Sequence, residues 1–444
     1  MSHYHFIAIG GAVMHNLALE LHALGHEISG SDDEIFDPAA SRLQARGLLP
    51  DALGWFSEKI NAQLEGVILG MHAKADNPEL QKAQELGVPI FSFPAFVHEH
   101  AKDKTRIVLA GSHGKTTCTA MLMHILKKEG MEFDYLVGST IAGYERMVGL
   151  SNAPLMIIEG DEYLSSALDL RSKFLHYKPH YALITGIAWD HVNVFPTLQS
   201  YEDTFRTFCD QVKNRCWFYG GDATLTKLAE NRGSFHAYGA PAFETLGSGT
   251  RVIIDNEQDY VLPFFGRHNI ENASGVVEIA VQLGVSRAAA WSHLGDFPGT
   301  AKRLECLQSS GTEIIFRDFA HAPSKVAATV SAVRSQFEDR YFLSVFELHT
   351  YSSLQPEFME GYKGLFEAAE EAWVLFDPHV FELKRMPVPS KEEVAHRLGN
   401  VRVFDHPKQL AEALNVWRLA SGARSRDAVT LWMSSGNFGG VKIV

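Results

Sequence analysis

A short glycine turn stands between an apolar run at residues 106–110 and a helical run that begins near residue 115. Glycines let the backbone fold so that consecutive N–H groups point at one phosphate, and the following helix adds its partial positive charge. The lysine of such a turn reaches the outer phosphates of a nucleotide, and the hydroxyl after it suits Mg²⁺. The sequence therefore predicts a phosphate-binding loop made of Gly111, Ser112, His113, Gly114, Lys115, Thr116 and Thr117.

Two further strand ends carry polar side chains. Residues 155–158 are apolar and lead to Glu159, and residues 182–185 lead to Asp190 and His191. Ligands gather at the carboxyl ends of parallel strands, and Mg²⁺ prefers oxygen ligands. We therefore expect Glu159 to join Thr116 at a metal ion, although polar strand ends also serve as helix caps. The Asp190-His191 pair is a second candidate, although a single histidine is more often packed or capping.

Strand-like and helix-like stretches alternate along most of the chain. Apolar runs at 6–9, 27–30, 67–69 and 89–91 are separated by helical patterns. This order predicts parallel strands with crossover helices, and thus an α/β fold. We expect an N-terminal Rossmann-like domain at 1–103, a central phosphate-loop ATPase domain at 104–297 and a C-terminal Rossmann-like domain at 298–444.

A hairpin interrupts this pattern in the central domain. Residues 251–254 and 260–262 flank Asp255 and Asn256, which predicts two antiparallel strands. A helix is expected at 270–283. In the last domain we expect strands near residues 314, 342, 374 and 403 and at 429–433.

The charge balance limits the partners that we expect. A formal net charge of −13 repels a phosphate backbone at long range, so nucleic acid is not an expected partner. The four cysteines show no paired CxxC spacing, which favours reduced thiols in a cytosol. No leader pattern and no run of eighteen apolar residues occurs, so we expect a cytoplasmic protein without a membrane partner.

Two other functions remain open from the residues alone. Gly10-Gly11 follows a strand and Asp32 lies about twenty residues on, as in a dinucleotide-dependent oxidoreductase. However, His15 or Asn16 stands where the third glycine of that fingerprint belongs. A kinase or a switch with a phosphate loop would explain Lys115 and Glu159, but not the polar motifs further along the chain.

Taken together, six motifs resemble one family, the muramyl (Mur) ligases. They are the phosphate loop, the acidic run at 159–163, Asp190-His191, the segment 266–273, the run 302–305 and the run 318–323. The resemblance covers nearly the whole chain in the family's order. It implies an ATP-dependent amide ligase that uses Mg²⁺, forms an acyl phosphate and acts on UDP-N-acetylmuramate and a peptide or amino acid in peptidoglycan synthesis.

The resemblance also implies roles for individual residues. Lys115, His191 and Arg303 are expected to be catalytic, and Mg²⁺ is expected at Thr116, Glu159 and His191. Besides the phosphate loop, the residues expected at ATP are His268, Asn269, Arg303, Asp318 and His321. Those expected along the UDP part of the substrate are Gly10, Gly11, Ser31 and Asp32.

Within the family, the run 171–177 and the closing run 434–440 resemble the recycling branch. That branch joins the tripeptide L-alanyl-γ-D-glutamyl-meso-diaminopimelate to UDP-N-acetylmuramate, which is the function that we expect. The alternative is a ligase that joins L-alanine to the same acceptor. The chain departs from the family pattern at His15, Asn16, Gly186, Ala188, Arg317 and Ala322, and the run 347–352 lacks an arginine of the recycling branch.

Overall fold

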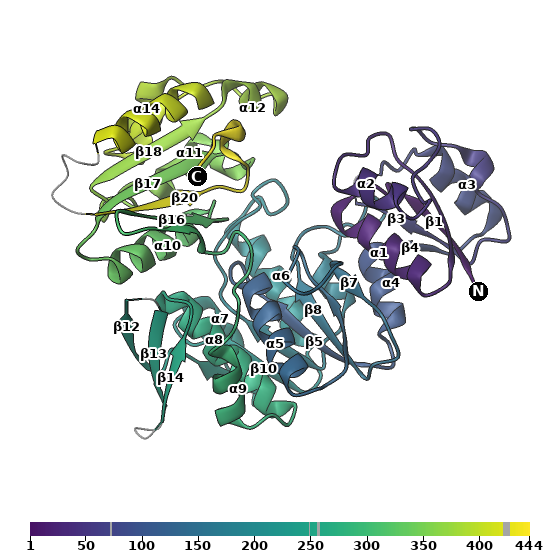
Figure 1. The fold of residues 1–444 in the computed structure, drawn as a ribbon. Coiled ribbons are helices and arrows are strands. Elements are labelled where there is room, and N and C mark those ends of the chain that lie inside the picture. Colours follow the sequence, from purple (N-terminus) through teal and green to yellow (C-terminus); the bar gives the residue numbers. More distant parts are fainter. Residues whose placement is uncertain (72, 248, 255–257, 421–426) are drawn as a thin grey trace. The chain divides into compact units, whose positions relative to one another are not determined.

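The computed structural model describes residues 1–71, 73–247, 249–254, 258–420 and 427–444 (Figure 1). The chain packs as two compact units. The first comprises Met1–Ile187, Leu198–Tyr238 and Gly275–Arg287, and the second comprises Ala188–Thr197, Gly239–Ser274 and Ala288–Val444. No helix in the described part of the chain is long and apolar enough to cross a membrane.

The first unit begins with a four-stranded sheet in the order β2-β1-β3-β4, and all its neighbouring strands are parallel. An apolar cluster that includes Ile7, Val67 and Leu80 packs α3 against it. Figure 1 shows these strands with α1, α3 and α4 around them. The elements are β1 (His3–Ile7), α1 (Ala12–Ala23), β2 (Glu27–Ser31), α2 (Ala39–Gln44), η1 (Ser57–Lys59), β3 (Gly66–Leu69), α3 (Pro78–Leu86), β4 (Ile90–Ser92) and α4 (Phe93–His100).

A seven-stranded sheet completes the first unit, in the order β11-β10-β9-β5-β8-β6-β7. Its strands are parallel except for β7, which runs antiparallel to β6. The strands are β5 (Thr105–Ala110), β6 (Phe133–Leu136), β7 (Val148–Gly149), β8 (Leu155–Gly160), β9 (Tyr181–Ile184), β10 (Arg215–Tyr219) and β11 (Phe235–Tyr238). The helices are α5 (Lys115–Lys128), η2 (Lys173–His176), α6 (Leu198–Asp210) and α7 (Ala223–Ala229).

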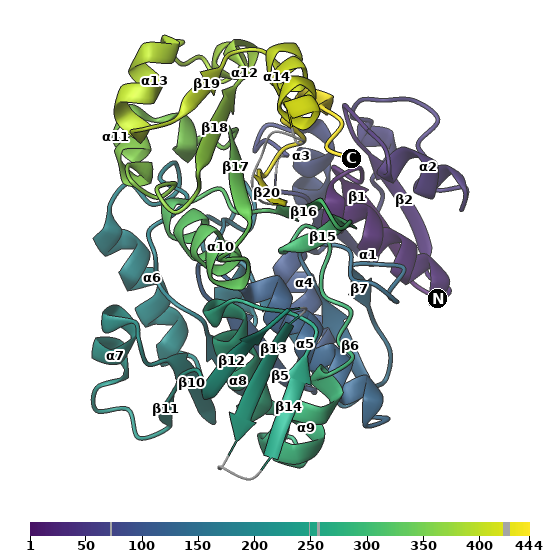
Figure 2. The ribbon, with the colours of Figure 1, turned by 60° about the vertical axis from the view of Figure 1, so that its left-hand side comes forward.

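The second unit contains an antiparallel sheet of three strands and a mixed sheet of six. Figure 2 shows the smaller sheet, formed by β12 (Ala242–Leu246), β13 (Gly249–Ile254) and β14 (Gln258–Leu262). Helix α8 (Arg267–Gln282) follows and runs from this unit into the first, and α9 (Arg287–Leu294) comes next.

The six-stranded sheet has the order β15-β16-β20-β17-β18-β19, and only β15 is antiparallel. Each face has its own apolar core, one built with α10 and the other with α14, and Figure 1 shows these helices on opposite faces. The strands are β15 (Glu305–Ser309), β16 (Glu313–Asp318), β17 (Tyr341–Leu348), β18 (Glu371–Phe376), β19 (Arg402–Phe404) and β20 (Ala428–Met433). The helices are α10 (Pro323–Gln336), η3 (Ser352–Leu354), α11 (Pro356–Met359), η4 (Glu360–Tyr362), α12 (Pro378–Leu383), α13 (Lys391–Leu398), α14 (Pro407–Leu419) and η6 (Phe438–Gly440).

The α/β fold class predicted from the sequence is confirmed. Each run expected to be a strand overlaps one, with ends that differ by no more than three residues. Runs buried on both faces of a parallel sheet are continuously apolar, which made most of these strands predictable. The predicted hairpin is present as β13 and β14. Its expected turn residues, Asp255 and Asn256, lie outside the described residues.

Candidate functional site

The phosphate loop joins the carboxyl end of β5 to the amino end of α5. Gly111 and Gly114 have φ angles of +124° and +70°, a backbone region that side chains disfavour. A Cβ at Gly111 would also lie 2.3 Å from the hydroxyl oxygen of Thr185. The Thr185 hydroxyl in turn donates to the carbonyls of Ala110 and His113. The loop is therefore fixed in a shape that only glycine at position 111 allows.

Lys115 lies inside the loop and is already engaged. Its ammonium donates to the Gly111 carbonyl at 2.7 Å and to Glu162 Oε2 at 2.8 Å. Burial alone would lower the pKa of Lys115, but the carboxylates of Glu162 and Asp161 raise it above its usual value. The side chain therefore stays positively charged at neutral pH, as a phosphate ligand must.

Thr116 and Glu159 are brought together, as oxygen ligands of one cation must be. The Thr116 hydroxyl donates to Glu159 Oε1 at 2.8 Å, and the Gly138 amide donates to Oε2 at 2.8 Å. Glu159 belongs to β8, which pairs with β5, so both side chains lie at the same sheet edge. A hydroxyl and a carboxylate fit Mg²⁺, which needs few protein ligands. Within the described residues, no group of three or more His, Cys, Asp or Glu is arranged to hold a metal by itself.

Glu162, Lys173 and Tyr201 belong to this network. Glu162 and Lys173 lie in runs that the sequence indicated without a role for either residue, and Tyr201 was not indicated. The Tyr201 hydroxyl lies 2.8 Å from Ser112 Oγ and donates to Glu162 Oε1 at 3.1 Å. Lys173 pairs with Asp161 at 2.7 Å. Although burial raises the pKa of Asp161, Lys173 and Lys115 lower it to about 2. Of the acidic residues that follow β8, the buried Glu162 thus pairs with Lys115, and the partly exposed Asp161 pairs with Lys173.

The residues predicted to line UDP meet at the first sheet edge. The Gly10 amide donates to Asp32 Oδ2 at 2.7 Å, and a Cβ on Gly10 would lie only 2.9 Å from that oxygen. Ser31, fully buried, ends β2, and its carbonyl accepts the amides of Ala8 and Ile9. Burial raises the pKa of Asp32, while the Gly10 amide opposes the shift. Gly10 and Gly11 therefore form the turn before α1, and Ser31 and Asp32 lie beside it at the end of β2.

The departures at His15 and Asn16 have a structural cause. Both side chains are buried in α1, and Asn16 Oδ1 accepts from the Met147 amide at 3.0 Å and from Arg42. One turn later Glu20 accepts from the Leu150 amide at 2.9 Å. The small residues expected there are replaced by polar ones because this side of α1 binds the segment around β7.

In the second unit, Asp318 organises the loop before β15. Its carboxylate accepts the amides of Leu304 at 2.6 Å and Ala320 at 2.7 Å. Burial raises the pKa of Asp318, and the nearby Arg303 partly opposes that shift. The Arg303 guanidinium lies 4.9 Å from the ring centroid of Phe319. Arg303 and Asp318, expected at ATP, are thus neighbours.

Asp190 and His321 are also neighbours, and both belong to the second unit. Asp190 Oδ2 accepts from Lys325 at 3.1 Å and lies 3.7 Å from His321 Nε2. Asp190 Oδ1 accepts the His191 amide at 2.8 Å. Burial and the charge of Lys325 lower the pKa of His321 to about 4, so its ring is neutral at pH 7. Lys325, which the sequence did not indicate, fastens the segment that carries His191.

The remaining expected ATP residues lie at the start of α8. Asn269 Nδ2 donates to the Phe265 carbonyl at 2.9 Å, which closes the first turn. Gly266, just before the helix, has a φ angle of +91°. Burial lowers the pKa of His268 to about 4, which leaves a neutral ring suited to hydrogen bonding or stacking rather than to holding phosphate.

The other departures are explained locally. Gly186 has a φ angle of +149°, and its carbonyl accepts the Ser112 amide at 2.9 Å, so it supports the phosphate loop through its backbone. Arg317 pairs with Glu305 at 2.9 Å between β16 and β15. Ala322 is buried where α10 begins. Nothing in the structure explains Ala188.

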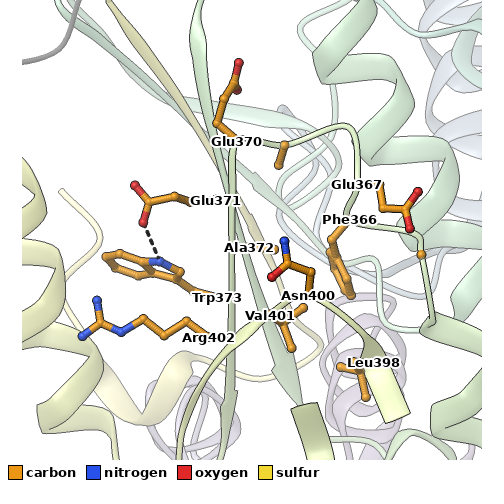
Figure 3. Close-up of a pocket in the computed structure, with 12 residues that line it drawn as sticks. Phe366, Glu367, Glu370, Glu371, Ala372, Trp373, Leu398, Asn400, Val401 and Arg402 are labelled. Carbon is orange, nitrogen blue, oxygen red and sulfur yellow. Dashed lines mark hydrogen bonds between the residues drawn. The ribbon is translucent and has the colours of Figure 1, made fainter. Parts of the chain in front are cut away.

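A pocket in the six-stranded sheet lies apart from these residues. Figure 3 shows it between Glu367, Glu371, Trp373, Leu398 and Arg402, at the amino end of β18. Glu371 accepts from the Trp373 and Trp417 indoles at 3.1 and 2.9 Å, so its carboxylate is already used. Ligands of parallel sheets bind at the carboxyl ends, so this pocket is not the candidate site.

Two family models match the chain. Residues 3–105 match the Mur ligase family, catalytic domain, and residues 109–280 match the Mur ligase middle domain. A UDP-N-acetylmuramate–L-alanine ligase of Lactobacillus delbrueckii subsp. bulgaricus is 30% identical over 381 residues, which cover 83% of each chain.

Two solved structures are similar over the whole chain. The UDP-N-acetylmuramate-alanine ligase of Thermotoga maritima has a TM-score of 0.72 at 20% identity and covers 99% of this chain and 96% of its own. A murein peptide ligase of Psychrobacter arcticus has a TM-score of 0.67 at 21% identity and covers 99% and 97%. At these identities the likeness shows the fold.

The expectation of a tripeptide substrate is wrong, because relatives about 30% identical over most of the chain are named L-alanine ligases. The segments that suggested the tripeptide have structural partners instead. Arg171 pairs with Asp169, and Phe174 stacks on Phe208 at 4.6 Å. In the closing run, the Phe438 amide donates to Glu347 Oε2 of β17 at 3.0 Å.

The two family models cover the residues of both sheet edges described above. The similarity to a ligase extends over most of both chains. The chain belongs to the Mur ligase family, whose members are ATP-dependent ligases that form amide bonds.

Proposed function

We propose that this ligase joins L-alanine to the carboxylate of UDP-N-acetylmuramate, with conversion of ATP to ADP and phosphate. The observation that carries the proposal is the 30% identity, over 83% of both chains, to a ligase named for that reaction. The alternative that the sequence left open thereby replaces the tripeptide. We also propose the division at 1–103, 104–297 and 298–444, with the acceptor, ATP and the amine as the respective ligands.

The first step activates the acceptor. A carboxylate resists attack by an amine because oxide is a poor leaving group. Transfer of the γ-phosphoryl group to a carboxylate oxygen gives an acyl phosphate and ADP. Lys115 is positively charged and pairs with Glu162 in the loop. When ATP binds, phosphoryl oxygens would replace Glu162 as its partner, and the ammonium would stabilise their negative charge. Arg303 is proposed to add positive charge.

A metal ion fits beside the loop. Thr116 and Glu159, 2.8 Å apart, have the oxygen chemistry for Mg²⁺, and His191 is proposed as a further ligand. Bound Mg²⁺ would offset the negative charge of the outer phosphates. Glu159 stays oriented because the Gly138 amide holds its second oxygen.

In the second step the neutral amine of L-alanine attacks the acyl carbon. The C–N bond forms, the C–O bond to phosphate breaks, and the nitrogen releases a proton. Water must be excluded because it would hydrolyse the acyl phosphate. His268, Asn269, Asp318 and His321 are proposed to hold the nucleotide during both steps, the first two at the adenine.

The test is product analysis by mass spectrometry. The protein is incubated with UDP-N-acetylmuramate, ATP and Mg²⁺ together with L-alanine, D-alanine, glycine, L-serine or short peptides. We expect one new product, whose mass equals that of the acceptor plus L-alanine minus water, and ADP in equal amount. Ligation of another amine in preference to L-alanine would overturn the amine assignment, and no ligation of any amine would overturn the acceptor.

A further inference from the structure

Lys59 lies at the carboxyl end of β2 without an acidic partner. Its ammonium donates to the Gly30 carbonyl and to Ser31 Oγ, both at 3.1 Å, and lies 4.7 Å from the Phe56 ring centroid. Within the described ranges, no carboxylate is paired with it. A half-buried ammonium whose partners are all neutral is not neutralised within the chain, so it can bind an anion.

Three other shielded lysines of the chain differ from Lys59. Lys104 pairs with Asp134 at 2.5 Å, and Lys115 pairs with Glu162 at 2.8 Å. Lys325 pairs with Asp190 at 3.1 Å. In each case the carboxylate is almost fully buried, so these cations are neutralised from within the chain. Lys59 lacks such compensation in a protein of net charge −13.

A buried chain of hydrogen bonds fixes the place of Lys59. Ser31, whose hydroxyl oxygen accepts a hydrogen bond from the Lys59 ammonium, is fully buried. Burial alone would raise the pKa of Glu79, but hydrogen bonds from His5 and Ser31 lower it. His5 Nε2 lies 3.2 Å from Glu79 Oε2, and both side chains are inaccessible to solvent. Such a network orients the Ser31 oxygen toward Lys59.

The position suits the diphosphate of a nucleotide. In Rossmann-like sheets, a diphosphate binds where the first strand turns into the first helix, beside the carboxyl end of the neighbouring strand. Here that turn is Gly10-Gly11, and the neighbouring strand is β2, which ends at Ser31. Asp32, an acidic side chain at this turn, accepts a hydrogen bond from the Gly10 amide.

We propose that Lys59 binds the diphosphate of the UDP-linked acceptor. It would thereby help the protein to select UDP-linked sugars over sugars that carry no diphosphate. This inference rests on the proposed function, because it takes the acceptor to be a uridine diphosphate. It adds a cation to the four residues predicted at that edge.

The experiment measures binding without catalysis. Isothermal titration of the full-length protein with UDP and with uridine is done for the natural chain and for Lys59→Met and Lys59→Arg. We expect Lys59→Met to weaken UDP binding by about tenfold to a hundredfold, as for a lost charge-assisted contact, and to leave uridine binding unchanged. Lys59→Arg should stay within about threefold of the natural chain.

Two controls separate the possible outcomes. Lys82→Met removes an exposed lysine of α3 that pairs with Glu85 at 3.0 Å, and it should bind UDP normally. Binding of ATP to Lys59→Met reports that the phosphate loop is still folded. Equal UDP affinity of Lys59→Met and the natural chain would overturn the inference, as would a loss of ATP binding together with UDP binding. If the natural chain itself binds no uridine nucleotide, the proposed function fails instead.

Discussion

Two buried lysine–carboxylate pairs in this ligase are alike in distance but differ in what surrounds them. In the phosphate loop, Lys115 meets Glu162 at 2.8 Å and also a backbone carbonyl, among glycines that leave room for phosphate. In the second unit, Lys325 meets Asp190 at 3.1 Å, beside the neutral ring of His321. We propose that the first pair exchanges its anion for a ligand, whereas the second links residues 188–197 to α10. The surroundings of an ion pair, and not its length, distinguish a binding group from a structural one.

The largest effect is expected at Lys115. Lys115→Ala should lower kcat/KM for ligation on the order of a thousandfold, because the charge that stabilises the transferred phosphoryl group is lost. Its removal also leaves Glu162 buried without a cation, which costs about 3–5 kcal/mol. Initial rates and urea unfolding measure the two effects.

The double variant Lys115→Ala/Glu162→Gln is the control for that cost. It should regain most of the stability and none of the activity. If it regains activity, Lys115 is a structural residue like Lys325, and the contrast between the two pairs disappears.

A smaller effect is expected when the second pair is broken. Lys325→Met should release residues 188–197 from α10, since Asp190 loses its cation, and should lower kcat by about tenfold to a hundredfold through misplacement of His191. Hydrogen exchange of the 188–197 amides should become faster. Lys363→Met, at an exposed lysine of the same unit, should change neither quantity. Unchanged protection in Lys325→Met would show that this pair fastens nothing.

The smallest effect concerns pH and His321. Its pKa is about 4 in the folded chain and about 6.5 when unfolded, so the unfolded chain binds more protons between these values. The stabilisation by the neutral ring is therefore complete above pH 6.5 and is lost as the pH falls toward 4. Between pH 7.5 and 4.5, His321→Gln should lose less stability than the natural chain, by on the order of 1–2 kcal/mol in urea unfolding. Parallel pH profiles would mean that the ring is already charged in the folded protein.

The sequence predicted the sheets and the loop because both depend on local patterns. Continuous apolar runs and the glycines at 111 and 114 specify strands and a turn within a few residues of themselves. The partners of the site residues could not be predicted in this way. Ser112 meets Tyr201 and Asp190 meets Lys325 across 89 and 135 residues, and no periodicity links them.

The error about the amine has the same origin. The run at 171–177 resembles the recycling branch in sequence, but its side chains are engaged in local pairing and packing. Arg171 pairs with a residue two positions earlier, and Phe174 and Tyr177 are buried in the first unit. A likeness made of core and turn residues reports a shared scaffold and carries no information on which amine is bound.

Helix α1 has a consequence for dissecting the chain. Its Asn16 and Glu20 side chains accept the amides of Met147 and Leu150, which lie more than a hundred residues later. A fragment that stops at residue 103 would keep all four strands of the first sheet but would expose this helix flank and leave its acceptors to water. A fragment made to express or crystallise the first sheet should therefore extend beyond residue 150.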